Sequence, residues 1–187
     1  MSGLRVIAGT AKGRRLKQVS GDTTRPIMDR VKESLFNILS TDIEEALVLD
    51  LFAGTGGVGI EALSRGAARA VFVEGNRTAV SVIQENLRAT GLGQRAQVVR
   101  SDVFIYLRND PSAGFDFIHV APPQYKNLWA DTLTTLDTRP AWLNPDGVAI
   151  AQIDPREFTE LSLQNLTLVD KRKYGSTLLC FYERIGE

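Results

Sequence analysis

The regular alternation of strand-like and helix-like segments is the feature that most constrains the fold of this chain. Short apolar runs that are typical of buried strands recur five times, separated by segments whose apolar residues have helical spacing. The predicted strands span residues 47–51, 70–74, 96–100, 115–120 and 147–151. This alternation predicts a parallel sheet that is covered by helices on both faces, and therefore an α/β fold.

Polar residues and glycines mark where the intervening helices begin and end. A helix that starts at residue 57 stops at Gly66, and Asn76 caps a helix that ends at Gly91. Asp102 caps a short helix through residue 107, and a helix containing Trp129 follows the fourth strand. The sequence therefore predicts a helix after each of the first four strands.

The two ends of the chain depart from this alternation. Residues 6–9 and 14–17 predict a hairpin, and apolar residues at helical spacing predict an amphipathic helix over 28–40. Residues 166–169 and 177–182 predict an antiparallel hairpin that completes the sheet. We therefore expect one domain over residues 1–187, with an extension at 1–40 and a core at 41–187.

Composition excludes several classes of protein. The 187 residues include 22 basic and 22 acidic ones, and no apolar run approaches the roughly 20 residues that span a membrane. No signal-peptide core follows Met1, and the single cysteine, Cys180, excludes an internal disulfide and a cysteine-rich metal site. These features predict a cytoplasmic protein without a metal or a membrane partner. The basic residues clustered between Arg5 and Arg30 suggest either an anionic partner such as RNA or a solubilising segment.

A glycine-rich turn joins the first strand to the next helix. Gly54, Gly56 and Gly59 satisfy the dinucleotide pattern G-x-G-x-x-G, and glycines let a ligand approach the backbone closely. Glu74 ends the second strand, at the usual distance for a carboxylate that binds ribose hydroxyls. One interpretation is therefore a nucleotide-dependent oxidoreductase.

S-adenosylmethionine is the second interpretation of the same turn. This cofactor also contains adenosine, but it carries a cationic amino-acid tail instead of a pyrophosphate. Asp50 lies beside the glycines, where it could meet that tail, and Asp102 follows the third strand, where it could hold the adenine amine. Asp102 could equally be only a helix cap and Glu74 only a surface acid. Three carboxylates at successive strand ends nevertheless suit a cationic cofactor better than a pyrophosphate.

At this point the sequence resembles a known family, the bacterial small-subunit (16S) ribosomal RNA guanine-N2 methyltransferases. The resemblance covers nearly the whole chain, and its N-terminal blocks are specific to the family. It is carried by the residues RVIAG at 5–9, KGRRL at 12–16, TRP at 24–26, DRVKESLFNIL at 29–39, LDLFAGTG at 49–56, EALSRGA at 61–67, YG at 174–175 and FY at 181–182.

The resemblance implies a seven-stranded, Rossmann-like methyltransferase fold with an N-terminal extension. It implies S-adenosylmethionine as cofactor, and a guanine N2 amine in small-subunit rRNA or a 30S particle as target. The sequence does not fix the oligomeric state, and a monomer is the expectation. The implied cofactor-binding residues are Asp50, Phe52, Ala53, Gly54, Thr55, Gly56, Glu74, Asp102 and Val103. The implied RNA-binding residues are Lys12, Arg14, Arg15, Arg25 and Arg30.

The chain departs from the family at the catalytic motif, which is an Asp or Asn, two prolines and an aromatic residue. Here the residues are Ala121, Pro122, Pro123, Gln124 and Tyr125, so the polar side chain is replaced by a methyl group. We expect the chemistry to survive through the backbone carbonyls of the first two residues, with Gln124 and Tyr125 nearby, because one lost acceptor costs ~1–3 kcal/mol.

Two further interpretations stay open beside this one. A protein with the altered motif could bind cofactor and RNA as a ribosome-assembly factor and transfer methyl slowly or not at all. The nucleotide-dependent oxidoreductase is the other alternative. His119, the only histidine, lies on a predicted buried strand and is expected to be a core residue rather than a base.

Overall fold

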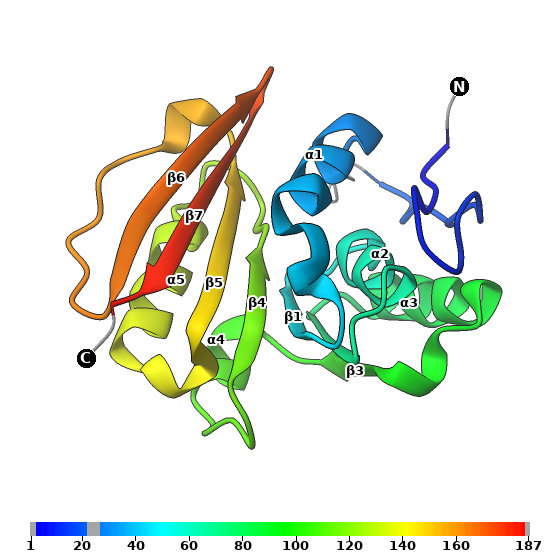
Figure 1. Cartoon of the computed structure of the whole chain (residues 1–187), viewed down its shortest axis with the longest axis horizontal. Helices are drawn as coiled ribbons and strands as arrows, with labels where there is room; N and C mark the ends of the chain where they lie inside the picture. Colours follow the sequence, from blue (N-terminus) through cyan, green and yellow to red (C-terminus); the bar gives the residue numbers. More distant parts are fainter. Residues whose placement is uncertain (1–2, 22–26, 186–187) are drawn as a thin grey trace.

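The computed structural model describes residues 3–21 and 27–185, and a single seven-stranded sheet forms their centre (Figure 1). The strands lie in the order β3-β2-β1-β4-β5-β7-β6; β1 to β5 run parallel, and β7 is antiparallel to both β5 and β6. Their bounds are β1 (Leu47–Leu51), β2 (Arg69–Glu74), β3 (Ala96–Arg100), β4 (Phe115–Val120), β5 (Leu143–Ile153), β6 (Leu166–Tyr174) and β7 (Thr177–Arg184). The predicted α/β class and seven-stranded fold are confirmed.

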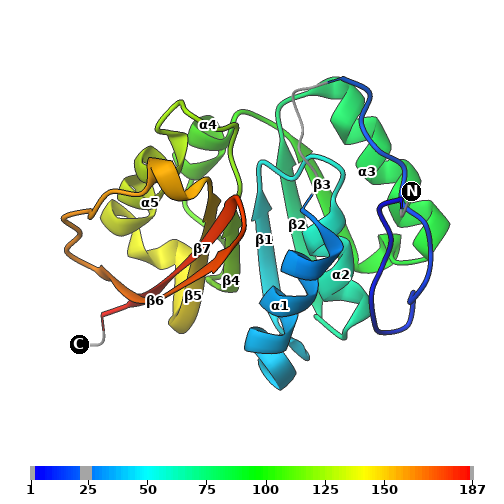
Figure 2. The ribbon, with the colours of Figure 1, turned by 90° about the horizontal axis from the view of Figure 1, so that it is seen from above.

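Helices cover both faces of this sheet (Figure 2). Residues of α1, α2 and α3 pack on one face together with the N-terminal segment, and residues of α4 and α5 pack on the other. The helices are α1 (Asp29–Leu39), α2 (Gly57–Ser64), α3 (Arg77–Thr90), α4 (Val103–Leu107) and α5 (Leu128–Thr138), with single 3₁₀ turns η1 (Ser40–Ile43), η2 (Gly93–Arg95), η3 (Pro140–Trp142) and η4 (Pro155–Glu157). Among the described residues, no helix is long and apolar enough to cross a membrane.

Local chemistry explains the helix ends. The Asn76 side chain accepts a hydrogen bond from the backbone N–H of Ala79, and α3 ends at Gly91, whose φ of 72° is left-handed. Asp102 accepts from the N–H groups of Phe104 and Ile105 and so caps α4. These helices begin and end where the sequence predicts.

Strand β5 is longer than predicted, because it begins at Leu143 rather than at Gly147. Its pairing with β4 shifts register between Phe115 and Phe117. The first part of β5 contains Pro145 and Asp146, which are more typical of turns than of strands. The sequence therefore predicts the strand only from Gly147 on. Strand β6 likewise continues to Tyr174, well past the predicted residue 169.

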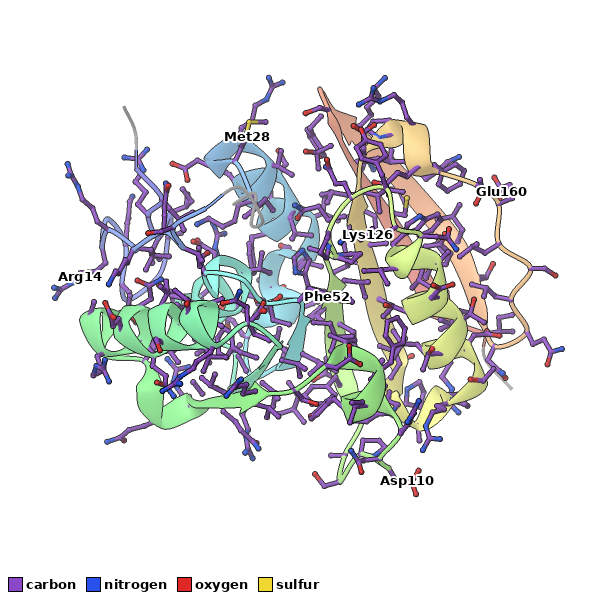
Figure 3. All side chains as sticks on the ribbon, turned by 180° about the vertical axis from the view of Figure 1, so that it is seen from behind. Arg14, Met28, Phe52, Asp110, Lys126 and Glu160 are labelled. Atoms are coloured by element: carbon purple, nitrogen blue, oxygen red, sulfur yellow. The ribbon has the colours of Figure 1, made fainter. Side chains whose placement is uncertain are left out.

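The N-terminal segment, residues 3–21, is docked on α2 by Glu61, which is fully buried. Its carboxylate accepts hydrogen bonds from the backbone N–H of Ile7 (2.9 Å) and of Ala8 (3.0 Å). It also faces two cations, with Arg65 Nε at 2.8 Å and Lys32 Nζ at 3.4 Å. We call residues 3–21 the N-terminal arm; Figure 3 shows Arg14 on its outer side, pointing away from the molecule.

A close approach between Gly9 and α2 completes this docking. A Cβ at Gly9 would lie 1.8 Å from the carbonyl oxygen of Ser64, and the φ of Gly9 is +81°. The same Ser64 accepts from the N–H of Thr10 and, through its hydroxyl, from that of Ala11. Only glycine fits here, so the arm lies directly against the helix.

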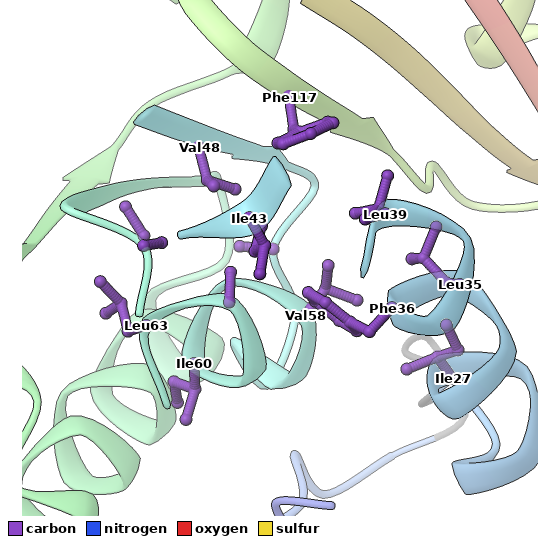
Figure 4. Packing of buried hydrophobic residues seen from close by; sticks show 14 of the residues in the cluster. Ile27, Leu35, Phe36, Leu39, Ile43, Val48, Val58, Ile60, Leu63 and Phe117 are labelled. Carbon is purple, nitrogen blue, oxygen red and sulfur yellow. The ribbon is translucent and has the colours of Figure 1, made fainter. Parts of the chain in front are cut away.

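Figure 4 shows how the hydrophobic core beneath this face is built. Leu35 and Phe36 of α1 share one cluster with Val58 of α2, Val48 of β1 and Phe117 of β4, and Phe36 lies beside Val58. These packed elements hold the start of α2 and the end of β1 rigidly in place, and the candidate site lies there.

Candidate cofactor and RNA site

A cavity of about 820 Å³ lies at the carboxyl ends of the parallel strands. Its size is that of a pocket for a cofactor or drug-sized molecule. Its walls come from the glycine turn after β1, the start of α2, the ends of β2, β4 and β5, the β6–β7 turn, the end of the N-terminal arm and the two residues before α1. The lining residues are Val19, Gly21, Ile27, Met28, Asp50, Phe52, Ala53, Gly54, Thr55, Gly57, Val58, Glu74, Asn76, His119, Ala121, Pro122, Pro123, Gln124, Lys126, Gln152, Ile153, Ser176 and Thr177.

The turn between β1 and α2 bends sharply through residues in left-handed conformation. Phe52, Gly54 and Gly56 have φ angles of 59°, 56° and 78°. A non-glycine residue in this region is uncommon and is held there by its surroundings. The turn brings the backbone of Gly54 and Thr55 to the cavity wall without intervening side-chain bulk, so a ligand can approach it closely.

Asp50 is buried at the floor of the cavity, and both of its carboxylate oxygens have partners. Oδ2 accepts from the backbone N–H of Gly59 at 3.1 Å, and Oδ1 lies 2.9 Å from Nδ1 of His119. The first bond fixes α2 to β1. A carboxylate oxygen has more than one lone pair, so Asp50 can still accept from a ligand, but its orientation is already set by the protein.

Glu74 stands at the other end of the cavity, where β2 ends. Its Oε2 accepts from the N–H of Gly54 at 2.9 Å, and its Oε1 accepts from the N–H of Asn76 at 2.8 Å. These two bonds fix the orientation of the carboxylate beside the glycine turn, and each oxygen keeps a lone pair for a hydroxyl donor. This is the arrangement expected of a carboxylate that binds a ribose.

Three predicted cofactor residues do not line the cavity. Gly56 is buried under α2, where a Cβ would contact Ile60 and Ile83 at 3.3 Å. Val103 packs in the core of the opposite face, and the Asp102 side chain caps α4. The helix-cap role of Asp102 is thus shown by the structure, and contact of these three residues with a bound cofactor stays a prediction.

The loop after β4 forms the wall opposite Glu74. Ala121, Pro122, Pro123 and Gln124, four of the five residues predicted to be catalytic, all line the cavity. The side chain of Ala121 offers no hydrogen-bonding group, so position 121 lacks a carboxylate or amide, and the side-chain amide on this wall is that of Gln124.

Tyr125 does not line the cavity with the rest of the loop. Its hydroxyl donates to Asp154 at 2.7 Å and also meets the guanidinium of Arg156, which stacks 5.5 Å from the ring centre. The hydrogen bond to Asp154 raises the pKa of Tyr125. The backbone of Tyr125 is left-handed, with a φ of 60°, and its N–H donates to Glu157. The ring is therefore fixed at the rim by η4, and its predicted contact with a target base stays a prediction.

Four of the predicted RNA-binding residues are exposed, namely Lys12, Arg14, Arg15 and Arg30. Among the described residues, none of these four forms an ion pair with a carboxylate. Arg25 lies outside the described residues. The arm that carries the first three continues to Val19 and Gly21 at the cavity, so it connects the basic surface with the candidate site.

Asn86 of α3 joins the arm to the glycine turn. Its Oδ1 accepts from the N–H of Lys17 at 2.7 Å, and its Nδ2 donates to the carbonyls of Lys17 (3.0 Å) and Thr55 (2.9 Å). This side chain is 2% exposed. One buried amide therefore holds both the segment expected to meet RNA and the segment expected to meet cofactor.

The sequence interpretation missed several lining residues. Gln152 at the end of β5, Lys126 in the loop after β4, Ser176 in the β6–β7 turn and Thr177 at the start of β7 were not predicted as site residues. His119 is 5% exposed, as expected for a core residue, yet it also lines the cavity. Only the strand order could have placed these residues together.

Comparison with known proteins assigns the family. The model of the family described as "Conserved hypothetical protein 95" matches residues 4–183. This chain belongs to that family. A Bacillus subtilis member, "Putative rRNA methyltransferase YlbH", is 38% identical over 185 residues, which cover 98% of this chain and 100% of the relative.

A second relative and a solved structure are similar to this chain over nearly its whole length. "Ribosomal RNA small subunit methyltransferase D" of Haemophilus influenzae is 33% identical over 184 residues, covering 96% of this chain and 93% of the relative. The solved structure "Putative methyltransferase yhhF from Escherichia coli" superposes with a TM-score of 0.88 at 30% identity, and both chains are covered completely. The resemblance found in the sequence is therefore confirmed.

Proposed function

We propose that this protein is an S-adenosylmethionine-dependent methyltransferase that methylates the exocyclic N2 amine of a guanine in small-subunit rRNA. The observation that carries the proposal is the single cavity that joins a ribose-type carboxylate, Glu74, to the loop Ala121–Gln124 on the opposite wall. The names of its relatives support the rRNA substrate. We further propose that it acts as one domain, whose N-terminal arm supplies the RNA contacts.

The residues at the cofactor end fit S-adenosylmethionine. Glu74 would accept the ribose hydroxyls, and the Gly54–Thr55 backbone would lie against the amino-acid tail. The acidic pair Asp50 and Glu74 favours a cationic molecule over one with a pyrophosphate. When bound, this cofactor supplies a methyl group on a sulfonium.

At the target end, the protein positions a weak nucleophile. A guanine amine has its lone pair delocalised into the ring, so it must be aimed along the axis of the bond to be broken. Correct positioning alone contributes on the order of 7–11 kcal/mol to lowering such barriers. Pro122 and Pro123 stiffen the loop whose carbonyls would hold the amine, and Gln124 adds a side-chain amide at the same wall.

Methyl transfer to RNA tests the proposal directly. Purified protein is incubated with labelled S-adenosylmethionine and with 30S particles or naked 16S rRNA from cells that lack this activity, and the nucleosides are analysed by mass spectrometry. We expect N2-methylguanosine at one position. No product at high enzyme concentration would contradict the proposal.

A matched variant links the product to the cavity. In E74A the ribose loses a charged acceptor, which is worth about 1.5–3 kcal/mol. We expect S-adenosylhomocysteine to bind roughly 10- to 150-fold more weakly in calorimetry, by the same conversion. Glu44, on the far side of α2 from this cavity, gives the control variant E44A, which should bind normally.

The replacement at Ala121 favours a second candidate, an RNA-binding assembly factor that transfers methyl slowly or not at all. This candidate predicts binding of 30S particles and of S-adenosylhomocysteine without product in single-turnover assays. The oxidoreductase alternative predicts thermal stabilisation by NAD or NADP, whereas the proposal predicts it for S-adenosylhomocysteine; a ligand at 100 times its Kd adds about 2.7 kcal/mol.

A further inference from the structure

His119 occupies the centre of a polar row that crosses three strands. Asp50 of β1, His119 of β4 and Gln152 of β5 face the same side of the sheet. Nδ1 of His119 lies 2.9 Å from Asp50 Oδ1, and Nε2 lies 3.1 Å from Gln152 Oε1. All three residues line the cavity. These two contacts satisfy both ring nitrogens of a buried side chain and fix the orientation of the ring at the cavity wall.

The strand order places this row between Glu74 on one side of the cavity and the β6–β7 turn on the other. Along the sheet edge the lining residues follow the order Glu74 (β2), Asp50 (β1), His119 (β4), Gln152 (β5) and Thr177 (β7). The ribose end lies at β2 and the catalytic loop follows β4. On the proposed function, methyl transfer takes place between these ends, so His119 lies at the junction.

Ala121 opens the way from this junction to His119. His119 lies on β4 and Ala121 directly follows the end of that strand, and both residues line the cavity. A carboxylate or amide at position 121 would put a larger polar side chain on this part of the wall. The methyl group of Ala121 leaves the ring on the cavity wall.

Asp50 fixes which nitrogen of the ring can act. A carboxylate only accepts hydrogen bonds, so it holds the neutral ring with the proton on Nδ1. Nε2 then carries a free lone pair that faces Gln152. A half-turn of the Gln152 amide lets it donate to Nε2 while no target is bound. The amine of the target must replace Gln152 at this lone pair when it binds.

We propose that His119 is the proton acceptor of this methyltransferase and takes over the role of the polar side chain that is absent at Ala121. The inference rests on the proposed function. In the step, the lone pair of the guanine N2 forms a bond to the methyl carbon, and the carbon–sulfur bond breaks with its electron pair remaining on sulfur. The surplus proton on N2 passes to Nε2 of His119, and Asp50 stabilises the resulting imidazolium.

The protonation state of His119 can be observed without any assay of activity. Because it is the only histidine in the chain, ¹⁵N spectra of untagged protein labelled at histidine report on this ring alone. With S-adenosylhomocysteine bound, we expect a protonated Nδ1 and an unprotonated Nε2. A ring that carries its proton on Nε2 instead would overturn the inference.

Two variants test the role in transfer. In H119N the amide nitrogen replaces Nδ1 and still donates to Asp50, but no atom replaces Nε2. We expect the single-turnover rate to fall by about 10²- to 10⁴-fold, the range for a general base, with the affinity for S-adenosylhomocysteine unchanged. In H119N/A121D a carboxylate returns to the wall, and we expect the rate to recover.

The outcomes separate the two proposals. A parent protein that makes no methylated RNA would contradict the proposed function and this inference with it. An active parent whose H119N variant keeps the parental rate would overturn this inference alone. So would an H119N variant that binds S-adenosylhomocysteine more weakly and is not rescued by A121D, because that result assigns His119 a structural role.

Discussion

Replacing Glu61 by glutamine should destabilise the protein more strongly than most single substitutions. The Glu61 carboxylate is fully buried, and it is the counter-charge of the fully buried Lys32. In E61Q one oxygen becomes an NH₂ group, which would face the N–H of either Ile7 or Ala8 as donor against donor. The arm would lose its anchor, and Lys32 would lose its ion pair.

The magnitude follows from the burial of both partners. Removing one partner of a buried ion pair costs about 3–5 kcal/mol because the other charge stays behind without compensation. Single domains unfold with a free energy of about 5–15 kcal/mol. E61Q should therefore lose a large fraction of the free energy of unfolding.

Urea unfolding followed by the fluorescence of the buried Trp129 and Trp142 measures this loss. The matched control is E33Q on the exposed side of α1, which should change the free energy of unfolding by no more than about 0.5 kcal/mol. The double variant K32M/E61Q removes the stranded cation as well and should recover part of the loss. A loss in E61Q of less than about 1 kcal/mol, the value of an exposed pair, would refute the reasoning.

The pH dependence of E61Q has a definite sign. Burial lowers the pKa of Lys32 below 10.5, and Glu61 opposes this shift. In E61Q no carboxylate at position 61 opposes the effect of burial, so the pKa of Lys32 falls further. Below 10.5 the unfolded chain then binds more protons than the folded one, and the free energy of unfolding must rise with pH. The deficit of E61Q against the parent should shrink between neutral pH and pH 10.

Three further predictions concern other parts of the molecule. G59A should lower the free energy of unfolding by about 1–3 kcal/mol in urea titrations, because its Cβ would lie 2.3 Å from the ring of Phe72. Cys180 should not react with Ellman's reagent at pH 8 until urea unfolds the chain, because burial raises the pKa of its thiol to about 12; rapid labelling of the native protein would contradict this. R14A and R15A should each weaken binding of 16S rRNA in filter-binding titrations and reduce the slope of log affinity against log salt by about 1, and an unchanged slope would place the RNA elsewhere.

Much of the fold could be predicted from the sequence because its signals are local. The alternation of strands and helices, the cap at Asn76 and the glycine turn after Asp50 each depend on residues within a few positions of one another. These signals gave the five parallel strands and the terminal hairpin. The start of β5 was missed because Pro145 and Asp146 are turn residues in most contexts, and here the neighbouring strand overrides that preference.

The candidate site was predicted only in part because its key contacts are distant in sequence. Asp50 and His119 are 69 residues apart, and their contact depends on β1 and β4 being neighbours in a definite register. Gln152 carries no motif, and the YG at 174–175 at the β6–β7 turn was part of the family resemblance without being assigned to the site. Tyr125 followed the expected prolines, but its hydrogen bond to Asp154 turns it to the rim, which no local pattern reveals.

The buried amide of Asn86 couples the N-terminal arm to the glycine turn after β1. Its donors and acceptor are shared between the backbone at Lys17 and the carbonyl of Thr55, so displacing either segment strands a polar group away from water at a cost of about 1–3 kcal/mol. A ligand that shifts the glycine turn must therefore shift the N-terminal arm with it, or lose this amount of binding free energy. If a bound cofactor raises the affinity for a nucleic acid through this coupling, the bound nucleic acid must raise the affinity for the cofactor by the same factor.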